Sequence, residues 1–113
     1  MYYIHTVLLD GCQYSISAKN LLDKYNINYK ATNVNHTNKD LFKTDNLQTF
    51  PQIFLKKHNN NGSVLLGGYS NLNDLFGMFY KQKLDNNKLS LVQNKYNMSK
   101  KAVLRLISLI NNY

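Results

Sequence analysis

Cys12 is the residue of this 113-residue chain with the clearest capacity for chemistry, because it is the only cysteine. It follows an apolar run and the turn dipeptide Asp10–Gly11, and the spacing of apolar residues becomes helical just after it. A thiol at the start of a helix faces unpaired N–H groups and the positive end of the helix dipole, which favours the nucleophilic thiolate. The charge of Asp10 opposes this effect. The alternative is that Cys12 is an inert small hydrophobic side chain.

The elements that must position Cys12 alternate between strand and helix. The β-branched and aromatic run Tyr3 to Leu9 predicts a strand that ends at the turn. A helix from Gln13 is predicted by an apolar stripe at Ala18, Leu21, Leu22 and Tyr25. The run Ile27 to Val34 predicts a second strand whose buried side carries Ile27, Tyr29 and Ala31. A strand, a helix and a strand in this order predict a parallel pair.

The second half of the chain predicts a hairpin followed by helices. Residues 35–48 are polar, with at most a helical turn at 39–43, and Pro51 opens an apolar strand that pairs with 63–66 around a tip at 59–62. Ser70 or Asn71 is expected to cap a helix whose apolar face carries Leu72, Leu75, Phe76 and Phe79. A polar connector is expected after residue 84, and then a helix capped by Ser99, with Val103, Leu106, Ile107 and Ile110 on one face.

The basic character of the chain lies mainly in its C-terminal third. The formal charge is +8, and residues 81–113 hold seven basic residues and one acidic residue, against seven and five in residues 1–80. A single cysteine excludes an intrachain disulfide framework and favours a reducing compartment. No apolar run approaches the length that spans a bilayer and no leader pattern is visible, so we expect a cytoplasmic protein with no membrane contact. No spacing among the histidines and the cysteine suggests a zinc site.

Three separated segments resemble motifs of the glutaredoxin family. They are Cys12-Gln13-Tyr14-Ser15, Thr49-Phe50-Pro51-Gln52 and Gly67-Gly68-Tyr69-Ser70-Asn71-Leu72. Each alone has a plain structural explanation, whereas three in order on the expected elements are specific. The resemblance implies a thioredoxin-like α/β fold, with a central mixed four-stranded sheet flanked by helices. It covers residues 1–83 as a domain and leaves 84–113 as a basic connector and an extra C-terminal helix, packed on the core or on a partner.

The resemblance also implies roles for individual residues. Cys12 matches the nucleophile, and Pro51 matches the family's cis-proline, which would expose the backbone of Phe50 for pairing with glutathione. The motifs imply further glutathione-binding residues. Tyr14 matches an aromatic residue beside the thiol, Gln48 could reach the glycyl carboxylate, and Thr49 is the neighbour of Phe50 in its motif. The segment that would hold the γ-glutamyl carboxylate is Gly68, Tyr69 and Ser70.

Two positions depart from the family pattern and define the expected reaction. Ser15 stands where dithiol members have a second cysteine, so any redox cycle must pass through a mixed disulfide with an outside thiol. Leu9 stands where many members place a lysine that steadies the thiolate. The resemblance thus implies a glutathione-dependent oxidoreductase that removes glutathione from mixed disulfides by a monothiol mechanism.

Two other functions remain open from the sequence. Glutaredoxins with a Cys-x-x-Ser motif include carriers of [2Fe–2S] clusters, and because one chain supplies one thiolate, Cys12, a cluster would need a homodimer and two glutathiones. Alternatively, the chain is a redox-silent interaction module whose basic C-terminal third binds nucleic acid or an acidic partner. The plainer interpretation of that third is an apolar face packed on the core or on a second copy, with solvated lysines outside.

Overall fold

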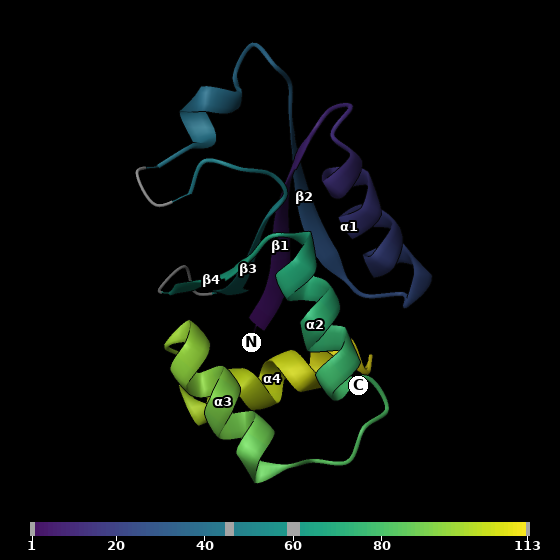
Figure 1. The fold of residues 1–113 in the computed structure, drawn as a ribbon, viewed down its shortest axis with the longest axis vertical. Coiled ribbons are helices and arrows are strands. Elements are labelled where there is room, and N and C mark those ends of the chain that lie inside the picture. Colours follow the sequence, from purple (N-terminus) through teal and green to yellow (C-terminus); the bar gives the residue numbers. More distant parts are fainter. Residues whose placement is uncertain (1, 45–46, 59–61, 113) are drawn as a thin grey trace.

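A mixed four-stranded sheet forms the centre of the molecule (Figure 1). The computed structural model describes residues 2–44, 47–58 and 62–112. The strands are β1 (Tyr2–Leu9), β2 (Tyr29–Val34), β3 (Gln52–Lys57) and β4 (Ser63–Gly67), in the order β2-β1-β3-β4. β1 and β2 are parallel, and the other two pairs are antiparallel. The sheet and the parallel pair confirm the expected fold class; residues 59–61 of the expected hairpin tip lie outside the described part.

Two helices bury one face of the sheet. α1 (Gln13–Lys24) and α2 (Tyr69–Phe79) pack against each other, and their apolar stripes join Ile4, Ile53 and Leu55 of the strands in one buried cluster. The helix stripe predicted from the sequence is accurate at Ala18 and Leu22, which are fully buried. This packing fixes the N-terminal ends of both helices beside the ends of the strands that precede them (Figure 1).

The other face of the sheet is covered near the end of β1 by the segment that follows β2. A short 3-10 helix, η1 (Lys39–Phe42), occupies the region where one helical turn is expected. Phe42 packs on a second, smaller cluster of buried side chains, Val7, Val34 and Phe50. The buried amide of Gln52 donates to the backbone carbonyl of Phe42 at 2.8 Å. The chain immediately before β3 is therefore held on the sheet by both apolar and polar contacts.

The inward face of β2 differs from the prediction. The strand begins at Tyr29 rather than Ile27, and Ala31, expected to be buried, is exposed, whereas Val34 on the opposite face is 1% exposed. β2 is an edge strand, and α1 packs over its neighbour β1, so little covers Ala31. Val34 is buried because the small cluster around Phe50 lies on its side of the sheet.

The C-terminal extension contains two helices, not the one that the sequence predicts. α3 (Asn86–Tyr96) occupies the expected polar connector, and α4 (Lys100–Ile110) is the expected helix, capped by Ser99, whose hydroxyl accepts from the N–H of Ala102 at 3.1 Å. The sequence does not predict α3 because the helix buries only Leu89 and Val92, which are too few to form a recognisable apolar stripe. Asp85 caps it by accepting from the N–H of Asn87 at 2.8 Å.

Both C-terminal helices pack on the sheet and on α2. The buried side chains of α4, Val103, Leu106 and Ile110, belong to the same cluster as the sheet residue Ile4. α4 contacts β1 and α2, and α3 contacts β4 (Figure 1). Within the described residues no helix is both long and apolar enough to cross a membrane.

Candidate active site

Cys12 lies at the junction of β1 and α1, as the sequence predicts. It is the N-cap residue of α1, and its backbone N–H donates to the carbonyl of Leu9 at 3.1 Å across the turn. Gly11 within this turn has a φ of +74°, a conformation that glycine adopts without strain. The thiol is free and partly exposed. Cys12 is therefore not buried in the core.

Ser15 connects the first turn of α1 to the end of β1. Its side chain is only 2% exposed, and its hydroxyl oxygen accepts a hydrogen bond from the N–H of Leu9 at 3.0 Å. Its position in the first helical turn also directs the hydroxyl and backbone N–H towards the sulfur of Cys12. Ser15 therefore holds the start of α1 to the end of β1 beside the thiol, and it cannot itself form a disulfide.

The surroundings of Cys12 favour its ionised form. Partial burial raises the pKa of the thiol, but hydrogen bonding from the N–H and hydroxyl of Ser15 and from the N–H of Tyr14 outweighs it. The net result is a pKa below the ordinary value for cysteine. This is the effect of the helix N-terminus that the sequence predicts, and a lower thiol pKa increases the share of reactive thiolate near neutral pH.

The segment before β3 meets the thiol. The Phe50–Pro51 peptide bond is cis, as the family resemblance implies. The Sγ atom of Cys12 lies 3.8 Å from the carbonyl oxygen of Phe50, while the ring of Phe50 is buried in the smaller cluster. Phe50 thus presents main chain, not ring, to the sulfur.

The third predicted segment begins α2 next to Pro51. Gly68 is the N-cap residue, so Ser70 and Asn71 lie inside the helix rather than capping it as the sequence predicts. A Cβ atom at Gly68 would lie 3.7 Å from the carbonyl oxygen of Pro51, which shows how closely the two segments approach. The carbonyl and N–H groups of these two segments therefore border the same region as Cys12.

Asn71 is a residue of this region that the sequence does not single out as a ligand-binding group. Its Oδ1 accepts from the N–H of Gly68 at 3.2 Å, and its Nδ2 donates to the hydroxyl of Tyr96 on α3 at 3.2 Å. The N–H of Gly68, expected to hold a carboxylate, already has this partner. The signal that could have identified Asn71 is its place three residues after a helix N-cap, where a side chain can reach back.

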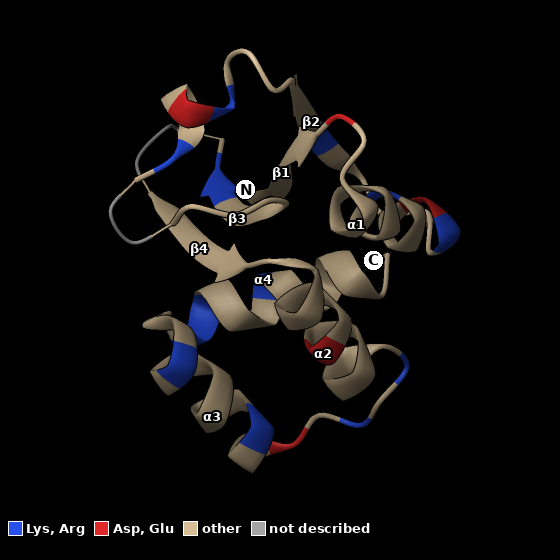
Figure 2. Cartoon of the chain, turned by 45° about the horizontal axis from the view of Figure 1, so that its top comes forward, with Lys and Arg blue, Asp and Glu red and all other residues tan. Residues whose placement is uncertain are grey.

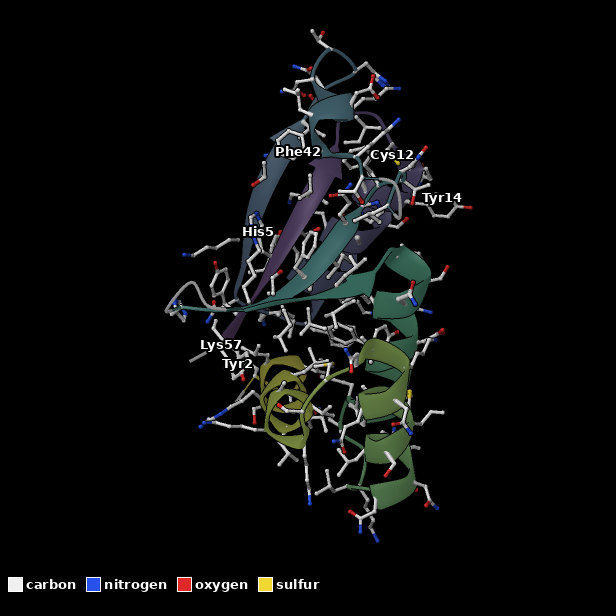
Figure 3. All side chains as sticks on the ribbon, turned by 90° about the vertical axis from the view of Figure 1, so that its left-hand side faces the viewer. Tyr2, His5, Cys12, Tyr14, Phe42 and Lys57 are labelled. Carbon is white, nitrogen blue, oxygen red and sulfur yellow. The ribbon has the colours of Figure 1, made fainter. Side chains whose placement is uncertain are left out.

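Two tyrosines join the first and third motifs. The rings of Tyr14 and Tyr69 lie 6.5 Å apart between centroids, and Tyr14 is 63% exposed. Figure 3 shows Tyr14 and Cys12 at the same end of the molecule. Gln48, Thr49 and Ser70 are exposed, and within the described residues their side chains form no hydrogen bond, so the geometry leaves their predicted roles open.

Comparison with known families identifies the family of the N-terminal half of the chain. A family model described as glutaredoxin matches residues 1–58. The chain belongs to the glutaredoxin family. The matched residues include Cys12, Ser15 and the Phe50–Pro51 bond, whereas the glycine-rich start of α2 lies beyond them. The family and the fold are those of thiol–disulfide oxidoreductases.

A solved structure has the same fold as this glutaredoxin. Glutaredoxin 1 from Francisella tularensis, a crystal structure complexed with cacodylate, superposes with a TM-score of 0.51 at 21% identity, covering 66% of this chain and 91% of that one. No curated protein matches the sequence.

The described residues supply few groups for a metal ion. Among residues 2–44, 47–58 and 62–112, no three side chains of the histidine, cysteine, aspartate and glutamate types gather closely enough to hold one. Cys12 is the single thiol of the glutaredoxin chain. An iron–sulfur cluster on this chain would therefore take its other thiolates from a second chain and from glutathione.

Proposed function

We propose that this glutaredoxin uses glutathione to reduce glutathione mixed disulfides by a monothiol mechanism. The Cys12 thiolate attacks the glutathionyl sulfur of the substrate, forming a disulfide between Cys12 and glutathione and expelling the substrate thiolate. A second glutathione thiolate then attacks the glutathionyl sulfur of that disulfide, releasing glutathione disulfide and the Cys12 thiolate. Overall, the mixed disulfide and one glutathione become the substrate thiol and glutathione disulfide. One disulfide bond breaks and one forms, and the substrate sulfur is reduced while the sulfur of the incoming glutathione is oxidised, so the cycle balances.

The observation that carries the proposal is the approach of Cys12 to the main chain of Phe50. The sulfur lies 3.8 Å from the carbonyl oxygen of Phe50 and remains partly exposed. An extended tripeptide whose sulfur meets Cys12 would bring its own peptide groups beside the backbone of Phe50. Backbone pairing of this kind positions a disulfide for attack without requiring a particular side chain at residue 50.

The beginning of α2 supplies the second part of the proposed glutathione site. The N–H groups of Tyr69 and Ser70 are in the first turn of the helix and have no intrahelical acceptor, so they and the Ser70 hydroxyl are available to the γ-glutamyl carboxylate. Asn71 holds the N–H of Gly68, which leaves that group to support the loop rather than the ligand. Tyr14 and Tyr69 would flank the tripeptide, and Gln48 and Thr49 lie on the exposed segment nearest its glycyl end.

Turnover of a glutathionylated peptide by the purified full chain, with glutathione as reductant, tests the proposal. We expect turnover that Cys12→Ser abolishes and Ser15→Ala retains in part. Mass spectrometry of the wild-type protein after exposure to glutathione disulfide should find one glutathione on Cys12. Absence of Cys12-dependent turnover, with circular dichroism showing a folded protein, would overturn the proposal.

A further inference from the structure

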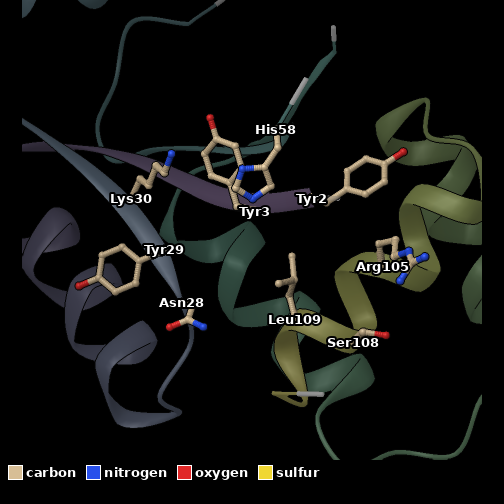
Figure 4. A pocket seen from close by; sticks show the side chains of 9 residues that line it. All are labelled: Tyr2, Tyr3, Asn28, Tyr29, Lys30, His58, Arg105, Ser108 and Leu109. Carbon is tan, nitrogen blue, oxygen red and sulfur yellow. The ribbon is translucent and has the colours of Figure 1, made fainter. Parts of the chain in front are cut away.

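A cavity lies at the opposite end of β1 from Cys12. It encloses about 480 Å³, between the first residues of β1, the start of β2, the residue after β3, and α4 (Figure 4). We call it the basal pocket. Figure 3 shows Tyr2, which lines it, and Cys12 at opposite ends of the sheet. Its volume falls in the range of small-molecule sites, and the proposed oxidoreductase chemistry makes no use of it.

Aromatic rings form one side of the basal pocket. Tyr3 and His58 are in contact, with ring centroids 4.7 Å apart and planes inclined by 44°, and Tyr2 and Tyr29 also line the space. Leu109 projects from α4 towards these rings (Figure 4). A planar group placed between the rings and Leu109 would be in contact with flat or apolar surfaces on both sides, which is how aromatic ligands are held.

Two cations of the basal pocket come from distant parts of the chain. Lys30 belongs to β2, with its Nζ 4.5 Å from the centroid of the Tyr3 ring, and Arg105 belongs to α4. None of the described lining residues is an aspartate or glutamate. The ion pairs found among the described residues are Lys19–Asp23 and Lys43–Asp40, so neither pocket cation is neutralised there. An unneutralised pair of cations beside apolar surface favours an anionic ligand.

The charge around the basal pocket extends beyond its walls. Burial and the charges of Lys56 and Lys30 hold the pKa of the nearby His5 below its ordinary value. The basic residues of α4 are blue in Figure 2. Arg105 also lines a neighbouring hollow of about 450 Å³, together with Lys100 and Lys101. That hollow has no aromatic residue among its described lining residues. Proteins that bind single-stranded nucleic acid stack successive bases on aromatic side chains, so the hollow does not extend the basal pocket into a site of that kind.

We propose that the basal pocket binds a small molecule that contains both a planar ring and a phosphate group, of the size and kind of a mononucleotide. The ring lies between the Tyr3–His58 pair and Leu109. Lys30 on the β2 side and Arg105 on the α4 side attract the phosphate by their positive charge (Figure 4). The site depends on the C-terminal extension, because α4 supplies Arg105 and Leu109, and it is independent of the thiol.

Titration of the isotopically labelled full chain with adenosine monophosphate, followed by NMR, tests the proposal. We expect the amide signals of Tyr3, Lys30 and Arg105 to shift, and adenosine and inorganic phosphate, each representing half of the ligand, to bind at least about tenfold more weakly. Lys30→Gln and Arg105→Gln should each weaken binding of adenosine monophosphate about tenfold. Lys83→Gln removes the same charge from an exposed residue outside the pocket and should leave binding unchanged.

Three results would overturn the proposal. The first is the absence of shifts at millimolar adenosine monophosphate. The second is an equal effect of Lys83→Gln and Arg105→Gln, which would indicate only general attraction to a basic protein. The third is binding of a single-stranded oligonucleotide without binding of the mononucleotide. Cys12→Ser should retain adenosine monophosphate binding, so failure of the oxidoreductase proposal and failure of this one give different results.

Discussion

The buried hydroxyl oxygen of Ser15 accepts a hydrogen bond from the backbone N–H of Leu9 at 3.0 Å, and so ties the first turn of the helix that begins after Cys12 to the strand before it. A second function of the same hydroxyl is to help lower the pKa of Cys12. The same side chain thus supports both the turn before α1 and the thiol of Cys12.

Ser15→Ala tests both functions of the hydroxyl. The substitution leaves the N–H of Leu9 without its partner, so we expect the free energy of unfolding to fall by about 1–2 kcal/mol. It should also raise the pKa of Cys12, because one donor to the thiolate is lost. Urea unfolding and the pH dependence of alkylation measure the two effects. Ser17→Ala, on the same helix, is the control; a variant at Ser15 indistinguishable from it would refute the role.

The ionisation of Cys12 can be followed directly by its reaction with iodoacetamide. Because hydrogen bonds from the first turn of α1 lower the thiol pKa, the rate should reach half its maximum at a lower pH in the folded chain than in the unfolded chain. The urea-unfolded chain provides the reference. Identical midpoints in the folded and unfolded chains would show that the helix terminus has no effect on the sulfur.

The ionisation of Cys12 should also make the free energy of unfolding depend on pH. The pKa is lower in the folded chain, so the thiolate stabilises the fold above the pKa of the unfolded chain, and this contribution disappears as the pH falls through the folded pKa. Cys12→Ser removes the contribution. The difference in unfolding free energy between wild type and variant should therefore widen in favour of the wild type as the pH rises. A difference independent of pH would contradict this expectation.

Gly67→Ala should disturb the segment that begins α2. Gly67 has a φ of +113°, and a Cβ atom there would collide with the side chain of Asn71. We expect a loss of about 1–3 kcal/mol in unfolding free energy, together with weaker binding of glutathione. Gly77→Ala is the matched control within α2, where a Cβ atom meets nothing within 4 Å and helix propensity predicts a gain of about 0.5–1 kcal/mol. Equal unfolding midpoints for the two variants would contradict the assigned geometry.

Leu106→Ala tests whether the C-terminal extension is part of the core. Leu106 is 0% exposed and belongs to the same buried cluster as the sheet, so we expect a loss of about 2–5 kcal/mol in unfolding free energy. Leu91→Ala makes the same change on α3, where Leu91 is 59% exposed, and should alter stability by no more than about 0.5 kcal/mol. A single cooperative transition is expected in both variants. If unfolding instead shows two transitions and Leu106→Ala removes only the smaller one, the C-terminal extension unfolds independently of the sheet.

Elements with strong apolar periods are predictable from this sequence, and elements with weak ones are not. The stripe through Ala18 and Leu22 predicts α1, whereas α3 buries only Leu89 and Val92 and reads as a connector. The inward face of β2 is mispredicted because alternation alone does not reveal that the strand lies at an edge. Burial of Val34 depends on Phe50, which comes from another part of the chain.

The candidate site is predictable to the extent that local motifs define it. The position of Cys12 at a helix start follows from a turn and a change of period, and its neighbour Phe50 follows from family resemblance. The contact between Asn71 and Tyr96 could not be predicted, because it requires a helix that the sequence did not reveal. The placement of Lys30 and Arg105 around one cavity likewise depends on the tertiary arrangement of segments that are far apart in the sequence.

Asn71 binds the hydroxyl of Tyr96 with one end of its amide and the N–H of Gly68 with the other. The C-terminal helices α3 and α4 are consequently connected to the proposed glutathione site and cannot be removed without affecting it. A version without residues 84–113, or one carrying a bulky fusion beside Tyr96, would alter the loop from which glutathione is proposed to be held, so we expect its kinetics to differ from those of the full chain.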